Sequence, residues 1–226
     1  MKTNIKDTSI EEYIQDASEF IPGRIHHQSL IVLYGLGNQG KTSTLTDLLF
    51  LLTNARIRDY VNAYFVRTMS NGSICYNDGY YVLKYERRSV FIATYGDGRE
   101  ECERNKDFFE HRPIDVPIYV IEKDRVLVLD ELSEKEQKKK YKDVTPDFCI
   151  SACRTEGGSV DAMMYLSDKM LPHILQEVWI RKLGIAEGEK PDFIYPSVPI
   201  ITRKDDNVAR AIKAFIRRVK DHQHCI

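Results

Sequence analysis

The sequence predicts an α/β fold, in which helices cover both faces of a mostly parallel β-sheet. Residues 29–34 and 148–153 are almost wholly apolar, as strands buried on both faces should be. Residues 41–54 carry leucines at helical spacing, which would pack one side of a helix on a sheet. Strands that alternate with helices along a chain favour a mostly parallel sheet.

The length and composition are typical of a globular protein. The 226 residues are 42% hydrophobic and 30% charged, which is enough apolar content for a packed core. We expect a single domain over residues 1–226. The formal net charge of −1 gives no basic excess, so binding to nucleic acid is not indicated.

Membrane, targeting and redox features together indicate a cytoplasmic protein. No apolar run is long enough to cross a bilayer, and residues 1–7 are polar, without the apolar centre of a signal peptide. We therefore expect no membrane association. The five cysteines are scattered and have the spacing of neither a zinc site nor a disulfide framework, which fits a reducing compartment.

The first half of the chain predicts helices and strands in alternation. Residues 1–28 are a lead-in, where the capping box Ser9-Ile10-Glu11-Glu12 begins a helix that ends near Phe20. The helix at residues 41–54 follows the first strand. The remaining elements are strands at 61–66, 80–85 and 89–95, the last two joined as a hairpin, and a charged helix at 100–110.

The second half begins with a variable excursion from the core, residues 113–145. Its polar segment, residues 132–142, is either an exposed helix or mobile, and the run Lys138-Lys139-Lys140 indicates a solvated helix face. The predicted elements are strands at 118–121 and 125–129 across a tight turn, a strand at 148–153, a helical region from 159 to near 184, a strand at 200–201, and a helix at 207–220.

One motif carries specific chemistry. Gly35-Leu36-Gly37-Asn38-Gln39-Gly40-Lys41-Thr42 matches G-x-x-x-x-G-K-[ST] and lies between a predicted strand and a predicted helix, as this motif requires. The glycines let consecutive backbone N–H groups turn inward around a phosphate, and the helix N-terminus adds partial positive charge. Lys41 would reach the β- and γ-phosphates, and the Thr42 hydroxyl would coordinate Mg²⁺. The phosphate-binding residues are then Gly35, Gly37, Asn38, Gln39, Gly40, Lys41, Thr42 and Ser43.

Through this motif, the segment from Leu30 to about Asn54 resembles the P-loop NTPase superfamily. The resemblance implies a three-layer α/β sandwich that binds a nucleoside triphosphate together with Mg²⁺. It also implies the roles of Lys41 and Thr42 given above. It does not separate ATPases, GTPases, kinases and nucleotide-gated switches.

The same resemblance implies an acidic residue at the end of another strand, which holds Mg²⁺ directly or through water. Asp97 follows the predicted strand at 89–95 and lies between two glycines, which allow close approach to a ligand. Asp130 follows the apolar run 126–129, and Glu131 beside it would polarise an attacking water. We consider both as metal residues and favour Asp97, because its strand leads directly into a helix.

Two partial matches keep GTP as an alternative to ATP. Asn38 gives the loop a form similar to that of one large class of GTPases, and Thr202-Arg203-Lys204-Asp205 is similar to their base-reading T-K-x-D. Arg203 replaces the usual lysine, however, and Ala93 stands where their D-x-x-G motif needs aspartate. We therefore expect ATP.

Arg154 follows the predicted strand at 148–153, at a strand end where open α/β sheets place ligands. It would neutralise transition-state charge as an internal arginine finger. A structural ion pair is the alternative. The candidate catalytic residues are Lys41, Asp97 and Arg154.

These observations predict a Mg²⁺-dependent nucleoside triphosphatase whose turnover is coupled to a protein partner or to self-association. A small-molecule or nucleotide kinase is the second hypothesis. It ranks lower because Asn38 stands where nucleotide kinases usually carry glycine and because the arginines are dispersed. A GTPase-like or nucleotide-gated switch with little turnover is the third.

Overall fold

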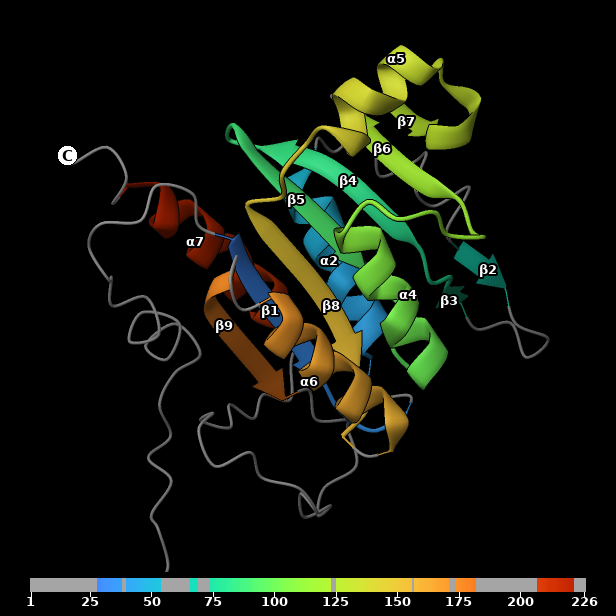
Figure 1. The fold of residues 1–226 in the computed structure, drawn as a ribbon. Helices are drawn as coiled ribbons and strands as arrows, with labels where there is room; N and C mark the ends of the chain where they lie inside the picture. The colour runs from blue at the N-terminus through green and yellow to red at the C-terminus, as the bar shows by residue number, and fades with distance from the viewer. Residues whose placement is uncertain are drawn as a thin grey trace, which may run out of the picture.

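The protein forms an α/β fold with a seven-stranded mixed sheet and helices on both faces (Figure 1). The computed structural model describes residues 28–37, 40–53, 66–68, 74–122, 125–155, 157–170, 174–181 and 207–221. The predictions of a helix at 9–20 and a strand at 200–201 lie outside these residues, as does most of the strand predicted at 61–66.

The strands and helices have the following bounds. The strands are β1 (Gln28–Tyr34), β2 (Val66–Thr68), β3 (Ile74–Tyr76), β4 (Tyr80–Tyr85), β5 (Arg88–Ala93), β6 (Ile118–Glu122), β7 (Arg125–Val128), β8 (Phe148–Cys153) and β9 (Ile174–Arg181). The α-helices are α2 (Lys41–Leu52), α4 (Arg99–Phe109), α5 (Glu134–Gln137), α6 (Gly158–Met170) and α7 (Asn207–Asp221). A 3₁₀ turn, η1 (Leu129–Glu131), and a π-helix, η2 (Lys138–Lys142), complete the set.

The prediction of a mostly parallel sheet is wrong, because the sheet is mixed. Its order is β7-β6-β4-β5-β8-β1-β9, and β5, β8, β1 and β9 run parallel to one another. The β4–β5 and β6–β7 pairs are antiparallel. Glu86 and Arg87 both have positive φ, 48° and 73°, so a two-residue turn with the twist favoured in hairpins reverses the chain between β4 and β5. Both hairpins are predicted by the sequence, and they reverse the direction of neighbouring strands.

The helix predicted from residue 159 to near 184 is correct only in its first half. α6 ends at Met170, and β9 then pairs in parallel with β1 along the whole of that strand. The ring of Trp179 contacts the edge of Tyr34, with ring centroids 6.1 Å apart. Burial against the neighbouring strand therefore outweighs helix propensity in this segment.

Alternate residues of β1, which lies between β8 and the edge strand β9, point into two separate cores. Ile31 and Leu33 pack with residues of α2 and α7, whereas Leu30 and Val32 pack with residues of α4 and α6. In Figure 1, α4 and α6 lie in front of the sheet and α2 lies behind it. The prediction that the apolar run at residues 29–34 is a strand buried on both faces is confirmed.

The buried side chain of Asn105 ties α4 to two strands, β4 and β8, and to the chain that follows β5. Its Nδ2 donates to the carbonyl of Tyr95 at 2.8 Å and to Ser151 Oγ at 2.9 Å, and its Oδ1 accepts a hydrogen bond from the Tyr80 hydroxyl at 2.9 Å. Asn105 is fully buried, and removal of one partner would leave a desolvated polar group. This network fixes the chain just before Gly96.

Part of the predicted excursion belongs to the sheet. β6 and β7 extend the sheet beyond β4, and the polar segment after them forms α5 and η2. Tyr141 of η2 is buried, and its hydroxyl donates to the carbonyl of Phe108 at 2.6 Å. Within the part of the chain that the structure describes, no helix is long and apolar enough to span a membrane.

Gly96 makes the tightest backbone approach between the chain after β5 and β8. A Cβ atom at this position would lie 2.1 Å from the Ala152 carbonyl oxygen. We predict that Gly96→Ala lowers the free energy of unfolding by about 1 to 3 kcal/mol in urea denaturation, because backbone must move to make room. Gly98→Ala is the matched control. Its Cβ would meet nothing within 4 Å, so an equal loss in both variants would contradict the prediction.

Candidate functional site

The glycine-rich loop joins the end of β1 to the start of α2, as the motif requires. The Gly35 N–H donates to the carbonyl of Cys153 at 3.2 Å, which holds the start of the loop beside β8. Gly40 has φ 77°, a conformation that glycine adopts without a steric penalty, and it is the N-cap of α2. Asn38 and Gln39 lie outside the described residues.

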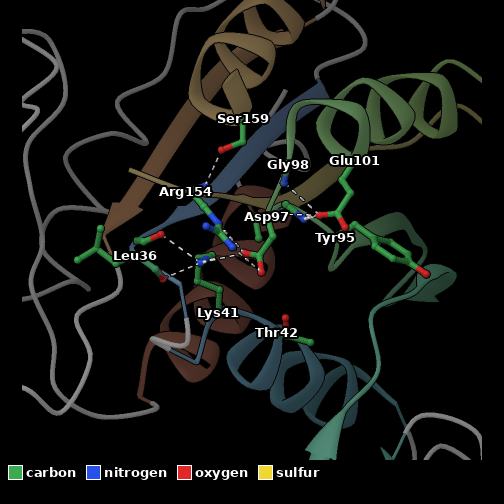
Figure 2. Close-up of polar contacts among 12 residues, drawn as sticks. Leu36, Lys41, Thr42, Tyr95, Asp97, Gly98, Glu101, Arg154 and Ser159 are labelled. Carbon is green, nitrogen blue, oxygen red and sulfur yellow. Dashed lines mark hydrogen bonds and ion pairs between the residues drawn. The ribbon is translucent and has the colours of Figure 1, made fainter. Parts of the chain in front are cut away.

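Lys41 is buried within its own loop. Its side chain is 6% exposed, and its Nζ donates to the carbonyls of Gly35 at 3.1 Å and Leu36 at 2.9 Å (Figure 2). The same nitrogen lies 3.8 Å from Asp97 Oδ1. Burial lowers the pKa of Lys41, and the carboxylate of Asp97 partly opposes this shift.

Asp97 lies between two cations. In addition to Lys41, the guanidinium of Arg154 contacts it at 3.3 Å from Nε to Oδ1 and at 3.3 Å from Nη2 to Oδ2. Partial burial favours a higher pKa for Asp97, but the hydrogen bond from Arg154 and the charge of Lys41 outweigh it. The pKa of Asp97 is therefore lowered, and the group is a carboxylate at neutral pH.

Glu101 fixes the turn that carries Asp97. Its Oε2 accepts hydrogen bonds from the N–H groups of Gly96, Asp97 and Gly98 at 3.0, 2.6 and 3.3 Å (Figure 2). On the other side, Ser159 Oγ accepts the N–H of Arg154 at 3.1 Å. The backbones of both members of the Asp97–Arg154 pair are thus held by helix N-termini, α4 and α6.

Asp78 is a member of the site that the sequence analysis missed. Thr42 Oγ1 donates to Asp78 Oδ1 at 2.9 Å. β4 runs antiparallel to β5, so the residues before β4 lie at the edge where β1, β5 and β8 end. Desolvation raises the pKa of Asp78, and the hydroxyls of Thr42 and Thr94 act in the opposite direction.

The structure brings most of the candidate residues together but separates one. Asp97 contacts both Lys41 and Arg154, and Thr42 lies at the start of the same helix as Lys41. Ser43 follows in α2 and is partly buried. Asp130 lies in η1 after β7, and five strand spacings of about 4.8 Å put β7 about 24 Å from β1.

The oxygen atoms beside Thr42 suit Mg²⁺ delivered with a triphosphate. Among the described residues, no cluster of three or more His, Cys, Asp or Glu side chains could hold a metal ion. The hydroxyl of Thr42 and the carboxylates of Asp78 and Asp97 are hard oxygen donors. Mg²⁺ at nucleotide sites takes one or two carboxylates and completes its shell with phosphate oxygens and water. Thr42, Asp78 and Asp97 thus supply oxygen donors of the kind that Mg²⁺ prefers.

Comparisons of the chain with protein-family models, with curated proteins and with solved structures gave no match. The loop and the side chains gathered beside it are therefore the evidence for its function.

The Glu101 carboxylate stabilises the turn at residues 96–98, and this contribution to stability can be measured. We predict that Glu101→Gln lowers the free energy of unfolding by about 1 to 2 kcal/mol, because a neutral amide oxygen accepts the three N–H groups less strongly. Glu103→Gln on the same helix is the control, since Glu103 forms only an exposed i,i+4 pair with Arg99. Equal stability of Glu101→Gln and the wild type in chemical denaturation would contradict this role.

Proposed function

We propose that the protein binds ATP with Mg²⁺ and hydrolyses it, as a P-loop NTPase-like protein. The observation that carries this proposal is the convergence of Lys41, Arg154, Asp97 and the Thr42–Asp78 pair beside the glycine-rich loop. Two cations, two carboxylates and a hydroxyl at the carboxyl edge of parallel strands are the chemistry that a triphosphate with its metal ion needs.

Lys41 is the proposed phosphate ligand. Its ammonium group is held by two neutral carbonyls and lies at a longer distance from Asp97. Phosphate oxygens carry more charge than carbonyls, so an incoming triphosphate competes well for this buried cation. The burial that desolvates Lys41 also strengthens its attraction for an anion.

Thr42 would hold Mg²⁺, with Asp78 and Asp97 as the nearby carboxylates. A hydroxyl has one proton and two lone pairs, and the Thr42 hydroxyl uses its proton to donate a hydrogen bond to Asp78. The lone pairs of Thr42 thus stay available to a cation. Bound Mg²⁺ would neutralise charge on the β- and γ-phosphates.

Asp97 and Arg154 would serve the hydrolytic step. A water oxygen attacks the γ-phosphorus while the bond to the bridging oxygen breaks, so negative charge grows on the leaving ADP and the equatorial oxygens. Arg154 would neutralise this charge. The carboxylate of Asp97 contacts the guanidinium of Arg154 and would hold it in position beside the loop. A Cβ at Gly37 would lie 3.7 Å from Arg154 Nη2, so the arginine reaches the phosphate loop itself.

ATP is favoured over GTP on the sequence. The base-reading candidate at residues 202–205 lies outside the described residues. Ala93, which stands in place of the aspartate of D-x-x-G, is buried in the core at the end of β5. The choice between ATP and GTP is tested by measuring release of the γ-phosphate from labelled ATP and from labelled GTP.

We predict that Lys41→Ala abolishes triphosphate binding and phosphate release while the protein stays folded. The variant loses the ammonium group in the loop, and circular dichroism checks the fold. Lys135→Ala is the control, because Lys135 is exposed on α5. Phosphate release that persists unchanged in Lys41→Ala would refute the proposed site, and transfer of the phosphate only to an added acceptor would indicate a kinase.

Alanine variants of Asp78, Asp97 and Asp130 should differ in the Mg²⁺ concentration that they need for phosphate release. We predict that Asp78→Ala and Asp97→Ala raise the Mg²⁺ concentration for half-maximal phosphate release by about tenfold or more, since loss of a metal-site carboxylate or its hydrogen-bonded partner typically has this effect. Asp130→Ala should match the wild type because of its distance. A larger effect of Asp130→Ala than of the other two would move the metal site to η1.

A further inference from the structure

A cavity lies beside the last residues of β4, at the opposite end of this strand from Asp78. Its volume is about 780 Å³, within the range of small-molecule sites. It is lined by the last residues of β4 and β6, the first residues of β5 and β7, and by η2. Lys84 lies six residues beyond Asp78 on the extended β4 segment, which is about 20 Å along the chain. The cavity is therefore separate from the phosphate loop.

The walls of this cavity carry an excess of positive charge. Lys84, Arg125, Lys139 and Lys140 line it, with Glu122 as the one acidic residue among its lining residues. Glu122 pairs with both Lys140 and Arg125. Lys84 and Lys139 have no carboxylate partner among the residues that the structure describes. Two ammonium groups are thus unneutralised beside a single shared carboxylate.

Apart from Ser89, the other described lining residues are apolar. Val82 and Val120 belong to neighbouring strands β4 and β6, and Val144 follows η2. Apolar walls bind the body of a ligand by removing its surface from water, and a few charged groups orient it. This combination suits a molecule with an apolar body and an anionic group.

The π-helix η2 forms a fixed wall of the cavity. Lys140 is only 14% exposed and pairs with Glu122 across the cavity rim, although the sequence predicts a solvated face for this lysine run. Tyr141, the next residue, is buried on the other side and contacts the carbonyl of Phe108. Two neighbouring residues of η2 thus contact different elements: Lys140 pairs with Glu122 of β6, and Tyr141 bonds to Phe108 of α4. Such local π-helical segments occur frequently at functional sites. In Figure 1, α5 and the β6–β7 hairpin lie together at this end of the molecule.

We propose that this cavity binds a small organic anion with an apolar, ring-sized body, held by Lys84 and Lys139 over the valine-lined sheet. The site is independent of the proposed nucleotide site, since the two share no residue.

The proposal is tested with a matched pair of fluorescent probes. 8-Anilinonaphthalene-1-sulfonate is an apolar aromatic anion, and N-phenyl-1-naphthylamine is the same body without the sulfonate. Titration of the full chain should show tighter binding of the anion than of the neutral probe. The double variant Lys84→Ala/Lys139→Ala should bind the anion at least about fivefold more weakly and bind the neutral probe as before.

Two controls assign the binding to this cavity. Lys142→Ala removes an exposed lysine of the same π-helix that does not line the cavity, and it should leave anion affinity unchanged. Saturating Mg-ADP should not displace the anion. Displacement by Mg-ADP, equal binding to the double variant, or no binding of the anion to the wild type would each overturn the proposal. None of these outcomes depends on whether the protein hydrolyses ATP.

Discussion

The parallel pairing of β1 with β8 is the constraint on which the site depends. Tyr34 and Cys153, the last residues of the two strands, are partners in the register, so the chain leaves both strands at the same level. Gly35 and Arg154 therefore begin neighbouring loops, and the Gly35 N–H is bonded to the carbonyl of Cys153. A shift of one residue would turn Arg154 to the other face of the sheet. The contact between the phosphate loop and the Asp97–Arg154 pair follows from this register.

Much of the fold could be predicted because the local signals were strong. The apolar runs of β1 and β8 and the leucine spacing of α2 mark their elements to within a few residues. The general rule for alternating strands and helices predicts the wrong sheet type here, because two tight turns reverse neighbouring strands. β9 was missed for a different reason: its strand conformation depends on pairing with β1, a contact that no local pattern encodes.

The candidate site was predictable where the motif is contiguous. Lys41 and Thr42 occupy fixed positions in an eight-residue pattern, so their location follows from the strand and helix around them. The separation of Asp130 from Lys41 could not be predicted without the strand order, which places β7 at the far edge of the sheet. The pair Asp78-Gly79 is typical of an ordinary turn. Asp78 lies beside Thr42 because β4 runs antiparallel to β5. The predicted hairpin therefore implies that the start of β4 and the end of β5 lie at the same side of the sheet.

The position of β1 between β8 and β9 has a consequence for the order of folding. The β4–β5 hairpin joins residues close in sequence, whereas Ser29 pairs with Phe148 and Leu33 with Ile180, far along the chain. Contacts between distant segments form slowly, because a long loop must close before they contribute stability. The hydrogen bond between Gly35 and Cys153 can therefore form only after β8 has been synthesised and has docked on β1. A ribosome-bound chain that ends before β8 would carry the whole motif, yet the surroundings that make it a site would still be missing.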